Sequence, residues 1–409
     1  MPVLRSIGLL ARCLPDGGQG EIHAVAAAAM AWDDGVVRWV GSEAELPAEY
    51  RDWPAEDARG RLVIPGLVDC HTHLAFGGWR GDEFAERLAG RDYLEIAAAG
   101  GGIAATVART RRLSVPMLVE RCRGHLREME RLGVTTVEAK SGYGLSFESE
   151  LALLEVYAEL ARTDPVRIVA TLLGAHVVPP EFKARRDEYL AMLVDRLIPE
   201  VGRRGLASFC DVFVEETAFP VDEARRILEA GKAAGLRSKL HADQLTAGGG
   251  AELAAEVGAI SADHLECISP AGIAAMAAAG VVAVSLPIAT LYLNQRPLPA
   301  RALMEAGVPV AVATDFNPGS APSYHLPLAM MLACTMQRMT PREVLRGATA
   351  IAAQAIGLGG EAGSLAPGLA ADFAIIDAPD PEFWMYHFRA NACLRTVRRG
   401  ETLWRAPEF

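Results

Sequence analysis

The stretch that decides the fold is residues 64–78, "IPGLVDCHTHLAFGG", an apolar run interrupted by His71 and His73. The apolar and β-branched residues before the histidines predict a buried strand. Because successive side chains of a strand alternate sides, two histidines separated by one residue share a face. The stretch therefore predicts a strand that brings two imidazoles together, either as metal ligands or as ordinary strand histidines.

Seven further runs of this kind occur along the chain, and each is followed by a helix-like segment. Eight strand–helix units are what a (β/α)8 barrel of the α/β class requires, whereas a doubly wound open sheet needs no such count. We therefore expect a TIM-type barrel over residues 63–363. The predicted strands are "LVIPGLVDCH", "VTTVEAKSG", "VRIVATLLGAH", "FCDVFVEE", "LRSKLHAD", "AISADHL", "VVAVSLP" and "VPVAVATDFN".

The two ends of the chain differ from this pattern. Residues 1–62 contain strand-like runs with Gly turns, such as "WDDGVVRWVGS", and residues 364–409 again resemble short strands. We expect these segments to form a small β-sandwich-like domain, built from both termini, beside the barrel.

Composition narrows the class of protein. A chain of 409 residues with 51% hydrophobic content can bury a large core. Its formal net charge of -11, with Lys and Arg spread along the chain, argues against a nucleic-acid partner. The seven cysteines are scattered and form no C-x-x-C pair, which fits a reducing compartment, and no signal peptide is evident. We expect a cytoplasmic globular protein.

One segment, residues 267–295, has no charged residue and is long enough for a membrane helix. However, "SPAGIAAMAAAG" predicts a short Ala-rich helix closed by glycine, and "VVAVSLP" predicts a strand stopped by proline. These breaks argue against a membrane span, so no membrane partner is expected.

Polar residues gather at the predicted strand ends, where barrels of this type carry their active sites. One histidine at such a place is more often structural than functional, but five together would be costly to bury without a shared purpose. The strand ends also carry Tyr143 and Asp315. The five histidines, of nine in the chain, are His71, His73, His176, His241 and His264.

Four of these side chains form a candidate metal site: His71, His73, His241 and Asp315. Nitrogen and oxygen ligands of this kind suit Zn²⁺ or iron and suit Ca²⁺ or Mg²⁺ poorly. A water beside such a cation can lose its proton near neutral pH, and the cation can polarise a carbonyl. The chemistry indicated is hydrolysis.

With these residues in place, the chain resembles the amidohydrolase superfamily over nearly its whole length, through "PGLVDCHTH", the histidines after strands five and six, "ATD" and "GSLAPGLAADFAIID". Within the superfamily it is similar to the imidazolonepropionase family. The motifs that carry this likeness are "HTHLAFGGWRGDEFAERLAG", "AAAGGGIAATVARTR", "VTTVEAKSGYGL", "LLGAHVVPPEF", "KLHADQL", "SADHLE" and "TDFNPG".

The resemblance implies that a metal-activated water opens the ring of 4-imidazolone-5-propanoate at its C–N amide bond, giving N-formimidoyl-L-glutamate, the third step of histidine degradation. It implies one metal ion per subunit, divalent zinc or iron (Zn²⁺ or Fe²⁺, or Fe³⁺ in the oxidised state), held by the four residues named above, and a homodimer. Arg80 would bind the propionate carboxylate, since its planar cationic fork suits that group. Tyr143 and His176 would contact the substrate, and Asn317, Gly319 and Ser320 would line the end where product forms.

Each of these residues has an ordinary structural alternative: Arg80 as a solvated loop charge, Tyr143 as a packed turn aromatic, and "NPGS" as a turn.

We expect Asp315 to accept the proton of the water, and His264 to orient that water or stabilise the developing oxyanion. Related deaminases carry a glutamate three residues after the strand-five histidine, where this chain has Gln244. Because an amide has no proton to transfer, Gln244 would bind substrate rather than act as an acid.

Some positions depart from the family's common pattern: Phe316 stands where cysteine is frequent, Ile288 where glycine is common, and "APSYH" follows Ser320, which leaves the contact of His325 open. Lys140 does not predict a second metal. In relatives with two metals the bridging lysine lies on strand four, where this chain has "FVEE" and no lysine. We expect Glu215 and Glu216 to be carboxylates of the rim rather than supports of the site.

Two other functions remain open. One is another cyclic-amide hydrolase or aminohydrolase of the superfamily with the same metal site. The other is a noncatalytic relative that keeps the fold as a scaffold. A scaffold would be expected to lose ligands, and here all four are present.

Overall fold

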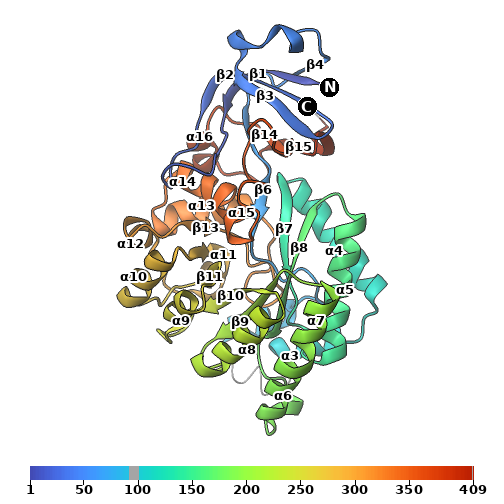
Figure 1. The fold of residues 1–409 in the computed structure, drawn as a ribbon, viewed down its shortest axis with the longest axis vertical. Helices are drawn as coiled ribbons and strands as arrows, with labels where there is room; N and C mark the ends of the chain where they lie inside the picture. Colours follow the sequence, from blue (N-terminus) through green and yellow to red (C-terminus); the bar gives the residue numbers. More distant parts are fainter. Residues whose placement is uncertain (92–100, 408) are drawn as a thin grey trace.

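The computed structural model describes residues 1–91, 101–407 and 409. It contains two sheets, one at the centre of a barrel and one in a smaller domain at the top of Figure 1, where both termini lie. The part of the motif "AAAGGGIAATVARTR" before Gly101 lies outside these residues. The predicted α/β fold class is confirmed.

The eight predicted barrel strands are all present, and neighbours in the barrel pair in parallel. Val134–Lys140 is buried at every position, as expected for parallel strands covered on both faces. The strands, in the order in which they pair, are β6 (Leu67–Asp69), β7 (Val134–Lys140), β8 (Arg167–Ala175), β9 (Phe209–Val214), β10 (Arg237–Ala242), β11 (Ser261–His264), β12 (Val282–Ser285) and β13 (Val310–Val312).

The barrel closes through the chain that follows its first and last strands. Thr72 and Phe316 form a parallel bridge, the amide of His73 donates to the carbonyl of Phe316 at 2.9 Å, and the amide of Asp315 donates to the carbonyl of His71 at 3.0 Å. Below this bridge, the hydroxyl of Thr314 donates to Asp69 at 2.6 Å. Closure therefore brings the two histidines of the first strand beside the aspartate of the eighth.

Helices surround the barrel strands (Figure 1). The Ala-rich helix expected from "SPAGIAAMAAAG" is α10: the Ser269 hydroxyl caps its first turn, and Gly280 ends it in the left-handed conformation. The helices that follow β6 to β9 are α1 (Gly81–Leu88), α3 (Ile103–Thr110), α4 (Val115–Glu130), α5 (Phe147–Thr163), α6 (Arg186–Met192), α7 (Ile198–Arg204) and α8 (Val221–Ala233). The later ones are α9 (Gly250–Glu256), α10 (Pro270–Ala279), α11 (Pro287–Leu293), α12 (Ala300–Glu305), α13 (Leu326–Gln337), α14 (Pro341–Gly347), α15 (Ala350–Ala355) and α16 (Pro381–Tyr386).

The second sheet is built from both termini, as the sequence predicts. It curls around its own core, so that Trp32 and Phe373, from strands far apart in the sheet, meet edge to face at 5.2 Å. Its strands in pairing order are β16 (Glu401–Arg405), β15 (Cys393–Arg398), β14 (Phe373–Ile376), β5 (Leu62–Pro65), β1 (Val3–Leu10), β2 (Val25–Asp33) and β3 (Val36–Ser42), with β4 (Ala55–Asp57) beside β1.

The run "LVIPGLVDCH" belongs to both sheets. Its first half is β5 of the terminal sheet and its second half is β6 of the barrel, with Gly66 between them. The chain thus passes directly from the small domain into the strand that leads to His71 and His73.

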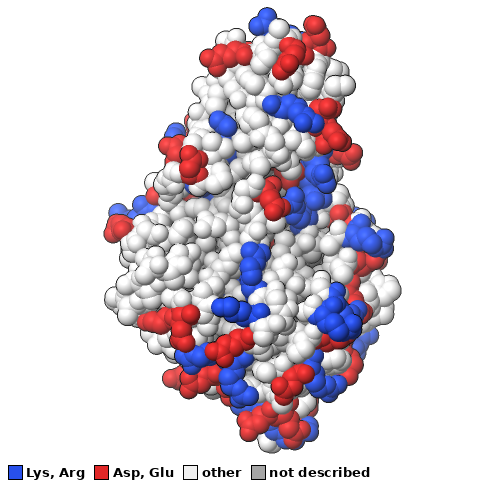
Figure 2. All heavy atoms as spheres, in the orientation of Figure 1, with Lys and Arg blue, Asp and Glu red and all other residues white. Residues whose placement is uncertain are grey.

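Figure 2 shows acidic and basic side chains interspersed on the face of Figure 1, without a broad area of one sign. Among the described residues, no helix combines the length and apolar character needed to span a bilayer.

We predict that Gly66→Ala destabilises the protein by about 1–3 kcal/mol, since a Cβ at position 66 would overlap the Thr135 side chain across the β6–β7 pair. Thermal or urea unfolding measures the change. The matched control is Gly124→Ala on the exposed side of α4, where a Cβ meets nothing within 4 Å and should stabilise the helix by up to about 1 kcal/mol. Equal unfolding midpoints for the Gly66 variant and the natural protein would contradict the prediction.

Candidate metal centre

The five strand-end histidines and Asp315 converge at one place. His71, His73, His241, His264 and Asp315 are each no more than 3% exposed. Their positions follow from the parallel barrel, in which the carboxyl ends of all strands open on one side. The convergence expected from the sequence is therefore present, although it does not by itself assign a role to each residue.

The distances between the inward atoms suit a metal ion. Asp315 Oδ1 lies 3.4 Å from both His71 Nε2 and His73 Nε2, and His241 Nε2 lies 3.4 Å from His73 Nε2. Tetrahedral bonds of about 2.0–2.1 Å to one cation separate its ligand atoms by roughly 3.3–3.4 Å. His71 Nε2 is buried and has no hydrogen-bond partner, although an orphaned polar atom is costly in a dry site. One ligand atom each of His71, His73 and Asp315 lies within 4.8 Å of the others, and the same holds for His71, His241 and His264, so a divalent cation fits among these side chains.

Two carboxylates orient the candidate ligands from behind. Asp263 Oδ2 lies 2.6 Å from His71 Nδ1, and Asp211 Oδ1 lies 3.1 Å from His241 Nδ1. A carboxylate that accepts the Nδ1 proton leaves the Nε2 lone pair for a metal and raises the basicity of the ligand. The sequence interpretation did not assign either aspartate.

Behind these aspartates lies a buried ionic network centred on Lys140. The Lys140 ammonium lies 2.7 Å from Asp211, 3.1 Å from Glu138 and 3.2 Å from Asp263, and Lys239 lies 3.1 Å from Glu138. All five side chains are fully buried. Burial lowers the pKa of Lys140, but the three carboxylates hold it well above its ordinary value. An ammonium held in this way is charged and paired, which agrees with the expectation that Lys140 does not bridge two metals.

The charge of this region also favours a cation. Three carboxylates face two ammonium groups in the network, and Asp315 adds another negative charge. Burial and Lys140 lower the pKa of His71, yet Asp263 and Asp315 hold it above its ordinary value. The site thus attracts positive charge, and a bound cation can replace the His71 proton, because metal binding releases protons from its ligands.

Burial favours the neutral form of three site histidines, His73, His176 and His264. Burial lowers the pKa of His73 to about 4, and it lowers the pKa of His176 and His264 well below the ordinary value. Neutral imidazoles offer a lone pair for a metal, a water or a substrate proton.

Tyr143 and His176 lie beside the candidate ligands. The His176 ring stacks on His73 at 5.2 Å, and the Tyr143 ring lies 5.7 Å from His73. The loop that carries Tyr143 is held by buried Glu150, whose carboxylate accepts the amides of Gly142, Gly144 and Leu145 at 2.7–3.2 Å. Tyr143 is thus fixed by the fold at the edge of the cluster.

Arg80 reaches the turn that follows Asp315. A Cβ at position 319 would overlap Arg80 Nη1, so the guanidinium lies directly on Gly319. Its Nε and Nη2 groups bind Glu83 at 2.9 and 2.7 Å. "NPGS" is a turn, as the ordinary alternative proposed: Asn317 Oδ1 accepts the amides of Gly319 and Ser320 at 2.8 Å. The turn nevertheless lies at the site.

Gln244 is buried next to His241, in a loop that Glu215 holds. Glu215 is 3% exposed and accepts the amide of Leu245 at 2.7 Å and the hydroxyl of Thr246 at 2.8 Å. The expectation that Glu215 is a rim carboxylate is wrong, because its side chain turns inward to satisfy these loop groups. Glu216 is exposed, as expected.

The departures from the family pattern have structural roles. Phe316 is fully buried among aromatic rings, with His125 at 5.0 Å and Tyr324 at 5.3 Å. His325 caps α13 by accepting the amide of Leu328, and its other nitrogen bonds the carbonyl of Ala390 at 2.7 Å. Ile288 is a buried residue of α11. Both His325 nitrogens are therefore engaged by the protein.

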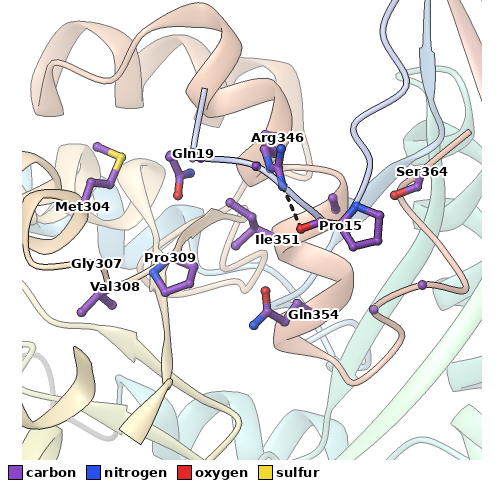
Figure 3. Close-up of a pocket in the computed structure, with 15 residues that line it drawn as sticks. Pro15, Gln19, Met304, Gly307, Val308, Pro309, Arg346, Ile351, Gln354 and Ser364 are labelled. Carbon is purple, nitrogen blue, oxygen red and sulfur yellow. Dashed lines mark hydrogen bonds between the residues drawn. The ribbon is translucent and has the colours of Figure 1, made fainter. Parts of the chain in front are cut away.

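A cavity of about 520 Å³ lies elsewhere, lined by Gln19, Val308, Arg346 and Ile351 among others (Figure 3). Val308 precedes β13, so the cavity adjoins the amino ends of the strands, whereas barrel active sites occupy the carboxyl ends. The Arg346 guanidinium donates to the carbonyls of Pro15 and Asp16 at 2.9 and 2.6 Å. This arginine anchors the N-terminal segment to the barrel, and we assign the chemistry to the histidine cluster instead.

Comparison with known proteins identifies relatives of this chain. The family described as "Amidohydrolase family" matches residues 108–403. A protein named imidazolonepropionase from Geobacillus thermodenitrificans is 52% identical over 90% of this chain and 88% of its own length. Another from Cupriavidus pinatubonensis is 45% identical, covering 95% of this chain and 91% of its own length.

Solved structures of similar fold have low identity. A 5-methylcytosine deaminase from Klebsiella pneumoniae with 5-fluorocytosine has a TM-score of 0.76 at 17% identity, covering 99% of this chain and 97% of its own. A mutant atrazine chlorohydrolase from Arthrobacter aurescens, complexed with zinc and atraton, has a TM-score of 0.74 at 18% identity, covering 98% and 95%. These likenesses show the fold alone.

We predict that Asp263→Asn lowers the affinity for Zn²⁺ by about 10–100-fold, because the amide no longer accepts the His71 proton as a carboxylate does. Competition with a chromophoric chelator measures the affinity. Asp222→Asn, whose side chain is 95% exposed on α8, is the control and should bind Zn²⁺ as the natural protein does. Unchanged affinity in the Asp263 variant would show that this aspartate does not support the metal site.

Proposed function

The chain belongs to the imidazolonepropionase family of the amidohydrolase superfamily, and we infer that its histidine and aspartate cluster hydrolyses the ring C–N bond of 4-imidazolone-5-propanoate. The product is N-formimidoyl-L-glutamate. The observation that carries the assignment to this substrate is the position of Arg80 on Gly319, which puts a guanidinium beside the turn that follows Asp315. A cationic group at that place suits a substrate with a carboxylate tail.

We propose that His71, His73, His241 and Asp315 hold one divalent cation. The Nε2 atoms of His71 and His73 each lie 3.4 Å from Asp315 Oδ1, and His241 Nε2 lies 3.4 Å from His73 Nε2. Lys140 is already neutralised by carboxylates, so a second metal bridged by it is not expected. Such a cation supplies an activated water at neutral pH and polarises the carbonyl of the substrate. The donor set serves zinc and iron alike. Elemental analysis of protein purified without added metal identifies the native ion.

The residues around the cluster then bind and orient the substrate. Arg80 Nη1 meets the propionate, while its Nε and Nη2 groups remain with Glu83. Tyr143 and His176, which lie beside His73, contact the ring and the carboxylate, and Gln244 holds the ring by hydrogen bonds. Asn317, Gly319 and Ser320 line the end where the new carboxylate forms.

Proton transfer falls to Asp315 and His264. Asp315 accepts a proton from the attacking water, and His264 orients that water or stabilises the oxyanion. Gln244 cannot act as an acid, which agrees with a ring opening in which the substrate nitrogen takes the proton.

A homodimer in the cytoplasm remains a prediction. Light scattering tests the oligomeric state, and cell fractionation tests the compartment.

We predict that the purified protein converts 4-imidazolone-5-propanoate to N-formimidoyl-L-glutamate, that dialysis against a chelator abolishes turnover, and that Zn²⁺ or Fe²⁺ restores it. Chromatography of substrate and product provides the measurement. Hydantoins, dihydropyrimidines and aminated heterocycles serve as comparison substrates. If one of these is hydrolysed and imidazolonepropanoate is not, the chain is another cyclic-amide hydrolase or aminohydrolase; if none is, it is a scaffold relative.

Arg80→Lys should raise KM for 4-imidazolone-5-propanoate by about 10-fold or more with a smaller effect on kcat, because lysine cannot reproduce the planar fork. Arg185→Lys, at an exposed pair with Glu188, is the matched control and should leave both parameters unchanged. Steady-state kinetics separate the two parameters. A normal KM in the Arg80 variant would remove this arginine from the substrate site.

A further inference from the structure

Two buried polar atoms face each other beside the metal site without any hydrogen-bond partner. They are His264 Nδ1 and Glu266 Oε2, 3.8 Å apart, in side chains that are each 2% exposed. Burial penalises such atoms unless they are paired. Two unpaired atoms this close together therefore indicate a hydrogen bond between them that tightens when substrate is bound.

The backbone builds this juxtaposition. His264 and Leu265 both have positive φ angles, 78° and 68°, a conformation that residues other than glycine seldom adopt. The amides of Leu265 and Cys267 are held by the carbonyls of Ala242 and Asp243, at 3.0 and 2.7 Å. The turn after β11 is thus fixed in a costly shape that places residue 266 beside residue 264, and functional sites are where such strain concentrates.

The other oxygen of Glu266 is anchored. The Thr290 hydroxyl, on the buried part of α11, lies 2.8 Å from Glu266 Oε1. The carboxylate is therefore fixed at one oxygen and open at the other. Catalytic hydrogen bonds are often long without substrate and tighten in the complex, so a gap of 3.8 Å is within reach of a small rotation.

We propose that Glu266 is a positioning residue for His264: its carboxylate accepts the Nδ1 proton and so fixes the ring with the Nε2 lone pair facing the metal site. A ring nitrogen of His264 lies within 4.8 Å of those of His71 and His241, so the ring does face that site. The inference rests on the role proposed for His264. Two roles were proposed for His264, orienting the attacking water or stabilising the oxyanion, and the inference favours the first. An Nε2 lone pair accepts a proton from water, and it cannot donate to an oxyanion until it has done so.

The test compares Glu266→Met, which removes the acceptor at similar length, with Glu266→Gln, whose amide oxygen can still accept the Nδ1 proton. We expect Glu266→Met to lower kcat by about 10–100-fold with little change in KM or zinc content, and Glu266→Gln to recover most of the loss. Thr290→Val removes only the hydroxyl that anchors Glu266 and should lower kcat by less than Glu266→Met does. If Glu266→Met fails to fold, Thr290→Val takes its place in the test.

Glu252→Met is the matched control. Glu252 also has one oxygen bonded to a hydroxyl, Ser269 at 2.7 Å, and one buried oxygen without a partner, but it lies on α9 away from the histidine rings. Its loss should leave kcat unchanged. An equal loss of kcat in both variants would mean that Glu266 is only a buried structural acid, and this would overturn the proposal.

A second readout does not depend on turnover. Long-range proton–nitrogen spectra of the zinc-loaded protein, labelled with ¹⁵N-histidine, report the tautomer of His264, which is assigned by its absence in His264→Asn. We expect the Nδ1–H form in the natural protein and in Glu266→Gln, and its loss in Glu266→Met. An unchanged tautomer in Glu266→Met overturns the proposal. Absence of turnover on 4-imidazolone-5-propanoate would refute the proposed function while leaving this readout to decide the inference.

Discussion

The arrangement of the site depends on the Lys140 ammonium, buried between Asp211 and Asp263. Each of these aspartates uses its carboxylate twice, once for the lysine and once for a site histidine, His241 or His71. A buried ion pair is weak evidence for stability, yet removing one partner leaves an uncompensated charge and costs about 3–5 kcal/mol. Because the aspartates that neutralise Lys140 also contact His241 and His71, the orientation of these two histidines is coupled to the stability of the fold.

A second constraint acts on the loops. Tyr143 and Gln244 lie on loops whose backbone amides are bound by buried carboxylates, Glu150 and Glu215 respectively. Loops seldom lie beneath a protein surface, because their backbone groups need partners there. Here Glu150 of α5 and Glu215 after β9 supply the partners, so the backbone beside the residues proposed to bind substrate is held by the protein itself. Such support reduces the entropy lost on binding.

The sequence predicts the barrel and the convergent histidines because both follow from local patterns: repeated apolar runs, most of which end in a polar residue. It does not reveal the ionic network, since Lys140 and Asp211 are 71 residues apart and meet only through strand register. A signal existed in the charged residues inside apolar strands, such as Asp211 in "FCDVFV". Glu215 was misassigned because adjacent glutamates look alike in sequence, while the turn that follows β9 buries one side chain and exposes the other.

The groups able to accept a proton at the site explain how a glutamine at position 244 is compatible with hydrolysis. Burial raises the pKa of Asp315, but the nearby imidazoles of His71 and His73 hold it well below its ordinary value. These contacts, at 3.4 Å, involve the Nε2 atoms that are also proposed to bind the cation, so the low pKa belongs to the cation-free arrangement. Asp315, as a proposed ligand, would face the cation as well as the attacking water, and His264, neutral and backed by Glu266, would provide a second proton acceptor. Two acceptors then lie beside the attacking water, and a third titratable group at position 244 is not required.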